Sequence, residues 1–389
     1  MTTEAYDVHG VRLLVHGDHP AAATAVDRRL RHFRTPDASG QHDVAIELTA
    51  GTDGVATGRA GRPVYDTPFG PVTYDDGSDQ LWADCGGRAW LDVRAGAGLA
   101  RLGAPADGED AWLISHPLLT IALVELLKRR DLYALHAAAL ATPAGATGIG
   151  DGIGDGTGAT GIGDGIGDGT GATGIGDGIG DGTGATGIGD GIGDGIGDGT
   201  GATGIGDGIG DGIGVVLFPG ASGAGKTTLA LALLRQGWGF LADDLVFLSG
   251  GDVLGFPDEV DVSEETAALF PAVAGSLHAP AAGGRAKRSL LVEEAFGGAA
   301  PVPRGRPVAV VLPHVSAEHA SRLAPLPPGD ALVALAPNVL LTDAVAAQAH
   351  FDSLGTLVRS APCFTLATGR DFGTLGRALA SLPLSPRSF

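Results

Sequence analysis

The sequence predicts an α/β protein in which a smaller β-rich α+β domain precedes a larger domain that carries a low-complexity insertion. Three observations lead to this prediction. Short apolar runs alternate with Gly, Pro and Asp turns up to about residue 112, a Gly/Asp repeat fills residues 148–214, and a strand, a glycine-rich loop and a helix follow one another from Val215. We therefore expect domains at residues 1–112 and at 113–147 with 215–389.

The composition limits the classes of protein to consider. With 389 residues and 44% apolar content, the chain can bury a core without disulfides or metal, and the isolated Cys85 and Cys363 are expected to be buried thiols. The formal charge of −20 falls to −9 once the eleven aspartates of the repeat are set aside. Basic residues form only short clusters such as Arg28–Arg34, which reads as a solvated helix face, so we expect no nucleic-acid partner.

No membrane segment is expected. The first residues, MTTEAYDVHG, do not lead from a basic stretch into an apolar one, and no apolar run approaches the roughly 18 residues that a membrane helix requires. We expect a soluble, cytoplasmic protein.

Periodicity places the first elements. Apolar residues at helical spacing predict helices over Ala21–Phe33 and Leu118–Arg130. Strands are expected at Val11–Val15, Val44–Leu48, Leu81–Ala83, Ala89–Val93 and Leu132–Ala141.

The insertion repeats GIGDGIGDGTGAT with a period of thirteen residues. Glycine at nearly every other position makes ordering costly, and the isolated Ile and Ala side chains cannot form a core, so we expect a disordered loop. A calcium-binding β-roll is the alternative, although the glycine pairs and nine-residue period of that motif are missing.

The segment after the repeat carries the chemistry. VVLFPGASGAGKTTLALALLRQG contains the P-loop pattern GxxxxGKT between an apolar strand and a helix that ends at Gly237. Glycines let the backbone N–H groups surround phosphate oxygens, Lys226 can span the β- and γ-phosphates of ATP, and the Thr227 hydroxyl can ligate Mg²⁺. The nucleotide-binding residues predicted from this motif are Gly220, Ala221, Ser222, Gly223, Ala224, Gly225, Lys226, Thr227 and Thr228.

Two carboxylates follow the P-loop in the run GWGFLADDLVFL. Asp243 and Asp244 lie where a returning strand would reach the phosphate site, so one can hold Mg²⁺ while the other accepts a proton from a hydroxyl group. Which aspartate has which role stays open, and a solvated turn is the alternative reading.

The matching residues GASGAGKTTLALALLRQGWGFLADDLVFL resemble the catalytic domain of the HPr kinase/phosphorylase family, and more closely the HPr-kinase-related proteins of bacterial peptide-modification clusters. The likeness extends loosely from about Leu113 to the C-terminus, less the insertion. It implies a P-loop sheet of the HPr kinase type and places a histidine, here His136 in ALHAAAL, beside Asp243 and Asp244. By itself, His136 would read as a core or strand-edge residue.

The resemblance implies a Mg-ATP-dependent serine/threonine-type kinase with a peptide or small-protein acceptor, and it makes a homo-oligomer plausible. Lys287, within Arg285–Arg288, could bind phosphates, with a solvated basic turn as the alternative. The Glu-x-Arg-Gly signature of bifunctional HPr kinases is missing, and the strand at Val308–Leu312 ends in Pro313-His314, so the metal carboxylate must come from Asp243 or Asp244. A small-molecule kinase and a non-catalytic ATP-binding regulator are the alternative functions.

Overall fold

The computed structural model has a mixed α/β fold, as the sequence predicts. It describes residues 2–36, 40–51, 61–143, 159–162, 172–175, 185–187, 213–279, 287–298, 300–380 and 382. The chain forms two compact units, one made of Met1–Thr142 with Gly210–Phe389 and the other of Pro143–Ile209.

The first unit begins with a nine-stranded sheet of order β3-β1-β2-β4-β9-β8-β7-β6-β5. Strands β2 and β4 are parallel, and helix α1 (Pro20–Leu30) lies between them in the chain, whereas β5 to β9 form an antiparallel meander. The strands and the helix predicted for this region are confirmed. The strand bounds are β1 (Thr2–Val8), β2 (Val11–Gly17), β3 (Arg34–Thr35), β4 (Val44–Ala50), β5 (Arg62–Thr67), β6 (Gly70–Asp75), β7 (Gln80–Asp84), β8 (Trp90–Arg94) and β9 (Leu99–Ala104).

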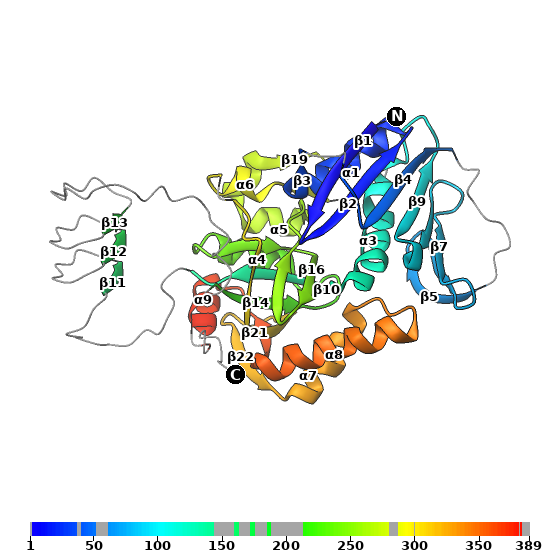
Figure 1. Ribbon diagram of the computed structural model, residues 1–389. Helices are drawn as coiled ribbons and strands as arrows, with labels where there is room; N and C mark the ends of the chain where they lie inside the picture. The colour runs from blue at the N-terminus through cyan, green and yellow to red at the C-terminus, as the bar shows by residue number, and fades with distance from the viewer. Residues whose placement is uncertain are drawn as a thin grey trace. The chain divides into compact units, whose positions relative to one another are not determined.

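Helix α3 (Leu119–Leu127) packs between this sheet and the strands that follow it (Figure 1). Eight of its nine residues are buried, and its core also contains Phe247 and Phe256 from the second sheet region. A helix that is apolar on all sides belongs in a core. The helical stretch Ala111–Arg130 is long and apolar enough to cross a membrane, but 72% of its most apolar part is buried inside the protein, as in the core helix of a soluble protein.

The second sheet has the order β14-β10-β16-β17-β21-β23-β22, with β15 paired to β10 and β14 also paired to β21. Strands β14, β21 and β23 are parallel. The strand bounds are β10 (Tyr133–Ala141), β14 (Gly214–Pro219), β15 (Gly239–Ala242), β16 (Leu245–Ser249), β17 (Asp252–Gly255), β21 (Arg304–Val315), β22 (Arg322–Leu326) and β23 (Cys363–Thr368).

Both faces of this sheet are covered, so its central strands are apolar on both sides. Along β14, Val216 and Phe218 pack against helix α4 (Lys226–Leu234), while Val215 and Leu217 face the core that contains residues of α7 and α8. Helices α7 (Pro328–Leu335) and α8 (Ala344–Ser360) lie side by side below the sheet in Figure 1. Cys85 and Cys363 are buried free thiols, as predicted.

A small antiparallel sheet packs on the α4 side. It consists of β18 (Val260–Val262), β20 (Arg288–Leu290) and β19 (Leu277–His278), and its Val260, Val262 and Leu290 join the core around α4. The adjoining helices are α5 (Glu264–Leu269), α6 (Val292–Ala295) and, from the C-terminal region, α9 (Phe372–Ala380).

The second unit contains three described strands, each of which spans the junction between two successive copies of the repeat: β11 (Ala159–Ile162), β12 (Ala172–Ile175) and β13 (Ala185–Gly187). They are parallel and in register, because Ala159, Ala172 and Ala185 occupy equivalent positions thirteen residues apart. Apart from Ile213 and Gly214, which lead into β14, the remainder of the expected disordered insertion lies outside the described residues.

The interpretation of Arg28–Arg34 as a solvated helix face is wrong for Arg29, whereas Arg34 is exposed. Arg29 keeps only 5% of its surface exposed and forms an ion pair with Asp258, while Arg28 pairs with Glu259 and Arg31 with Glu293. These carboxylates are more than 200 residues away along the chain, so the local sequence could not reveal that this part of α1 packs against them.

Candidate functional site

The glycine-rich loop connects β14 to α4. Every residue of β14 is buried, which fixes the start of the loop, and Gly223 and Gly225 have φ values of 84° and 91° that favour glycine. A Cβ atom on Gly225 would lie 3.2 Å from Val315, at the end of the neighbouring strand β21. No side chain caps α4, so its first-turn N–H groups point toward the loop without a side-chain acceptor.

Lys226, the first residue of α4, is folded back into the loop. Its Nζ donates to the carbonyl oxygens of Gly220 at 2.5 Å and Ala221 at 3.3 Å, and it lies 3.0 Å from Nε2 of His136. Burial lowers the pKa of Lys226, against the opposing charges of Asp244 and Asp243. The carbonyl contacts are ones that phosphate oxygens could replace.

Thr227 and Asp243 form a second contact at the start of α4. The Thr227 hydroxyl donates to Oδ2 of Asp243 at 2.9 Å, while Oδ1 of Asp243 is buried and has no hydrogen-bond partner among the described residues. Burial raises the pKa of Asp243 to about 6, the Thr227 hydrogen bond opposes that shift, and the charge of Asp244 adds to it. An unpartnered buried carboxylate oxygen is costly unless a cation or a proton joins it.

Asp244 faces His136 instead. Its Oδ1 lies 3.1 Å from Nδ1 of His136, and the backbone N–H of Ala137 donates to the Asp244 carbonyl at 3.2 Å. Burial would raise the pKa of Asp244, but the hydrogen bond from His136 and nearby positive charge, including that of Arg29, outweigh it and hold the pKa below its usual value. The Asp244 side chain keeps 46% of its surface accessible, so an acceptor group can reach it.

His136 therefore joins Asp244 to Lys226. An ammonium group can only donate, so Nε2 accepts from Lys226 and the ring proton sits on Nδ1, facing Asp244. The histidine lies on β10, opposite Leu245 of β16, because the two strands pair antiparallel there. The contact between His136 and Lys226 had no signal in the sequence.

Two further residues complete the surroundings. The Thr228 hydroxyl lies 3.0 Å from that of Thr266 on α5, which ties the small sheet region to the start of α4. Lys287 is exposed, and its positive charge adds a little to the lowering of the Lys226 pKa that burial causes. Ser222, Gly223 and Ala224 lie in the loop as expected, while Arg285 lies outside the described residues.

The oxygen atoms of Thr227 and Asp243 fit a magnesium ion. Within the described part of the chain, no group of three or more His, Cys, Asp or Glu residues could hold a metal by itself. Mg²⁺ in nucleotide sites usually takes only one or two protein ligands and completes its shell with water and phosphate oxygens. One hydroxyl and one unpartnered carboxylate oxygen meet that requirement.

Comparison with protein-family models gives no match, and comparison with curated proteins gives none either.

Proposed function

We propose that the protein is a Mg-ATP-dependent kinase that transfers a phosphoryl group to a hydroxyl acceptor, on a P-loop sheet of the HPr kinase type. The observation that carries the proposal is the Thr227–Asp243 hydrogen bond beside the glycine-rich loop, with the second oxygen of Asp243 buried and unpartnered. This is the arrangement in which a hydroxyl and a carboxylate share a magnesium ion next to bound phosphates.

The loop and its lysine would bind the triphosphate. The Lys226 ammonium group already points into the loop, toward the carbonyls of Gly220 and Ala221, and has a short path to β- and γ-phosphate oxygens. Lys287 adds positive charge from the β20 side. When bound, Mg²⁺ neutralises the negative charge of the phosphates, and Thr227 with Asp243 would hold it.

The geometry favours different roles for the two aspartates. Asp243 accepts the hydrogen bond of Thr227 and would bind the metal together with it. The accessible Asp244 would instead receive the proton of an acceptor hydroxyl. His136 orients the Asp244 carboxylate through Nδ1.

The test is Mg-ATP binding and turnover by the purified full chain, compared with Lys226→Ala and Asp243→Asn. We expect wild type to bind Mg-ATP, Lys226→Ala to lose most affinity, and Asp243→Asn to lose the magnesium dependence of binding. Nucleotide binding without phosphoryl transfer to any acceptor would favour a regulatory protein instead. Equal Mg-ATP binding by all three proteins would refute the site itself.

A further inference from the structure

The carboxyl ends of three parallel strands, β14, β21 and β23, meet at one edge of the second sheet. The glycine-rich loop leaves this edge from β14, which has β10 on one side and β21 followed by β23 on the other. Ligands of α/β sheets bind outside the carboxyl ends of the strands. The ends of β21 and β23 are therefore in place to contact a ligand that extends beyond the loop.

The magnesium side of the loop sets the direction of a bound nucleotide. Asp243 follows β15, which pairs with β10, so the contact between Thr227 and Asp243 lies on the β10 side of β14. In the proposed function, Mg²⁺ on that side bridges the β- and γ-phosphates. The nucleoside is attached to the other end of the triphosphate, and the opposite side, over β21 and β23, is left for it.

Val315, the last residue of β21, lies beside the glycine-rich loop. A Cβ atom on Gly225 would be 3.2 Å from Cγ2 of Val315, and Val315 keeps 67% of its surface exposed. A single exposed valine is ordinary on a protein surface, and what distinguishes Val315 is its place against a phosphate-binding loop. Its side chain offers an apolar surface that the base or ribose of a nucleotide could cover.

Thr368, the last residue of β23, is paired with Val315 in the parallel ladder. Val311 and Leu366, on the same two strands, pack in the core around α4. Because side chains along a strand alternate between the two faces, Val315 and Thr368 point to the α4 side as well. Thr368 is only 7% exposed, and its hydroxyl is buried with no hydrogen-bond partner among the described residues. Such a hydroxyl costs free energy until a ligand group bonds it.

The segments that follow β21 and β23 are held together by their backbones. The N–H of Ser316 donates to the carbonyl of Thr368 at 3.0 Å, and the N–H of Asp371 donates to that of His319 at 2.9 Å. A Cβ atom on Gly369 would be 2.5 Å from the His319 carbonyl oxygen, so the close approach requires glycine. These contacts fix both strand ends before a ligand arrives, which lowers the entropy cost of binding.

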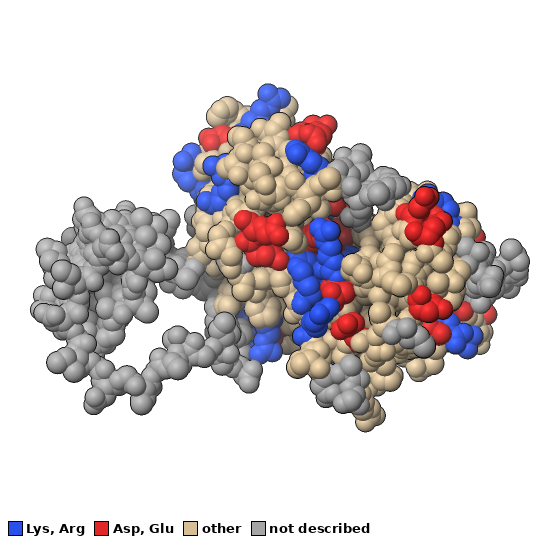
Figure 2. Space-filling view, turned by 90° about the horizontal axis from the view of Figure 1, so that it is seen from above, with Lys and Arg blue, Asp and Glu red and all other residues tan. Residues whose placement is uncertain are grey.

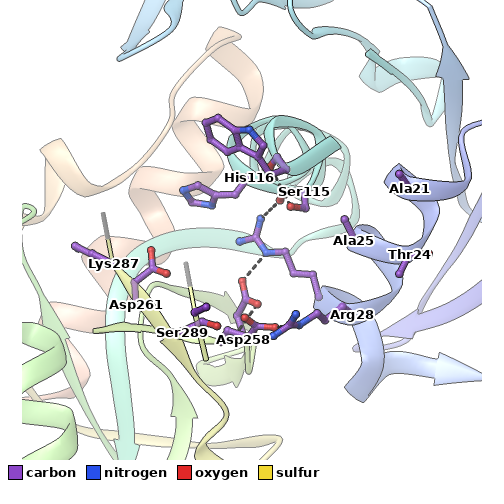
Figure 3. Close-up of a pocket in the computed structure, with 14 residues that line it drawn as sticks. Ala21, Thr24, Ala25, Arg28, Ser115, His116, Asp258, Asp261, Lys287 and Ser289 are labelled. Carbon is purple, nitrogen blue, oxygen red and sulfur yellow. Dashed lines mark hydrogen bonds and ion pairs between the residues drawn. The ribbon is translucent and has the colours of Figure 1, made fainter. Parts of the chain in front are cut away.

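The pocket beside α1, of about 320 Å³, is another candidate for the nucleoside (Figure 3). Its lining comes from α1, the turn at Ser115–His116 and the small sheet region, and includes no described residue of the glycine-rich loop. Arg28 and Arg29 in the lining are paired with Glu259 and Asp258. Basic and acidic side chains also lie beside one another on the face of the molecule seen in Figure 2. The ends of β21 and β23, which adjoin the loop directly, are favoured over this pocket.

We propose that the carboxyl ends of β21 and β23 form the nucleoside-binding part of the site. Val315 packs against the base or ribose, and the Thr368 hydroxyl forms a hydrogen bond with the nucleoside. The inference rests on the proposed kinase function and adds the residues that distinguish a nucleotide from its bare phosphate chain.

The experiment compares Mg-ATP with Mg-tripolyphosphate, which has a chain of three phosphates and no nucleoside. Binding of each probe to the purified full chain is measured by calorimetry. Val315→Ser removes the apolar surface, and Thr368→Val removes the hydroxyl while nearly keeping the shape of the side chain. Val333→Ser is the matched control, because Val333 is 74% exposed and lies on α7, which packs on the face of the sheet opposite α4.

We expect the Kd for Mg-ATP to rise about 3- to 10-fold in Val315→Ser and in Thr368→Val, with the Kd for Mg-tripolyphosphate unchanged and Val333→Ser like wild type. Thermal unfolding identifies a variant that fails to fold, and the other variant then decides. Unchanged Mg-ATP affinity in the folded variants, or equal weakening for both probes, would overturn the proposal. Wild type that binds neither probe is a different result, which contradicts the proposed kinase function instead.

Discussion

Replacing Asp243 by asparagine should stabilise the protein while disabling its metal site. Folding raises the pKa of this carboxyl from 3.8 to about 6, mainly through burial, so the folded state prefers the protonated form. The stability that this preference contributes is complete below pH 3.8, declines as the pH rises toward 6 and is absent above it. At pH 7.5 without Mg²⁺, the ionised Asp243 therefore costs stability.

The shift from 3.8 to about 6 corresponds to at most about 3 kcal/mol, at 1.36 kcal/mol per pH unit. Asparagine has nearly the same shape, can still accept from Thr227 and never ionises. Asp243→Asn should thus exceed wild type in unfolding free energy by up to about 3 kcal/mol at pH 7.5, and the difference should shrink toward pH 4. Urea unfolding followed by the fluorescence of the four tryptophans, none of which lies in the repeat, measures it.

Asp244→Asn is the control, because the pKa of Asp244 is shifted in the opposite direction to that of Asp243. His136 holds the pKa of Asp244 below its usual value, so the ionised form stabilises the folded state and its loss should lower the unfolding free energy at pH 7.5. The same sign for both variants at pH 7.5, or a difference between Asp243→Asn and wild type that does not change toward pH 4, would refute the reasoning.

Three further predictions follow from the same contacts. Mg²⁺-dependent nucleotide binding should weaken as the pH falls below about 6, because protonated Asp243 is a poor metal ligand; calorimetric titration from pH 5 to 8 checks this, and a flat profile contradicts it. Arg29→Met leaves Asp258 without its partner and should lower the free energy of unfolding in urea by about 3 kcal/mol. Arg34→Ala removes an exposed pair with Asp27 and should lower it by less than about 1 kcal/mol. Similar losses in the two variants would show that burial is not the cause. Replacing residues 144–212 by Asn-Gly should leave stability and turnover nearly unchanged, since Thr142 donates to Gly214 and the strands are placed for a tight hairpin; collapse of the fold would show that the repeat is structural.

Much of the fold could be predicted because its signals are local. The alternation of apolar residues predicted β2, β4, β7 and β8 of the first sheet, and the helix predicted at Leu118–Arg130 is observed as α3 and the short 3₁₀ helix after it. The packing of α3 could not be predicted in the same way. This helix lies after the domain boundary predicted at residue 112, yet its side chains pack in the core of the first sheet. Tertiary packing, not periodicity, decides which core such a predominantly apolar helix joins.

The sequence by itself determined the β14–loop–α4 unit. Glycine is needed where φ is positive, a buried apolar strand must precede the loop, and Lys226 and Thr227 can act only at the first helical turn, so a short run of residues contains the whole signal. Only the tertiary structure decided that Asp243 accepts a hydrogen bond from Thr227 and that Asp244 contacts His136. It also buried Arg29 against Asp258 and formed the pocket beside α1. These contacts join residues as many as 229 positions apart, and their energies depend on burial and distance in space, which no local spacing in a sequence specifies.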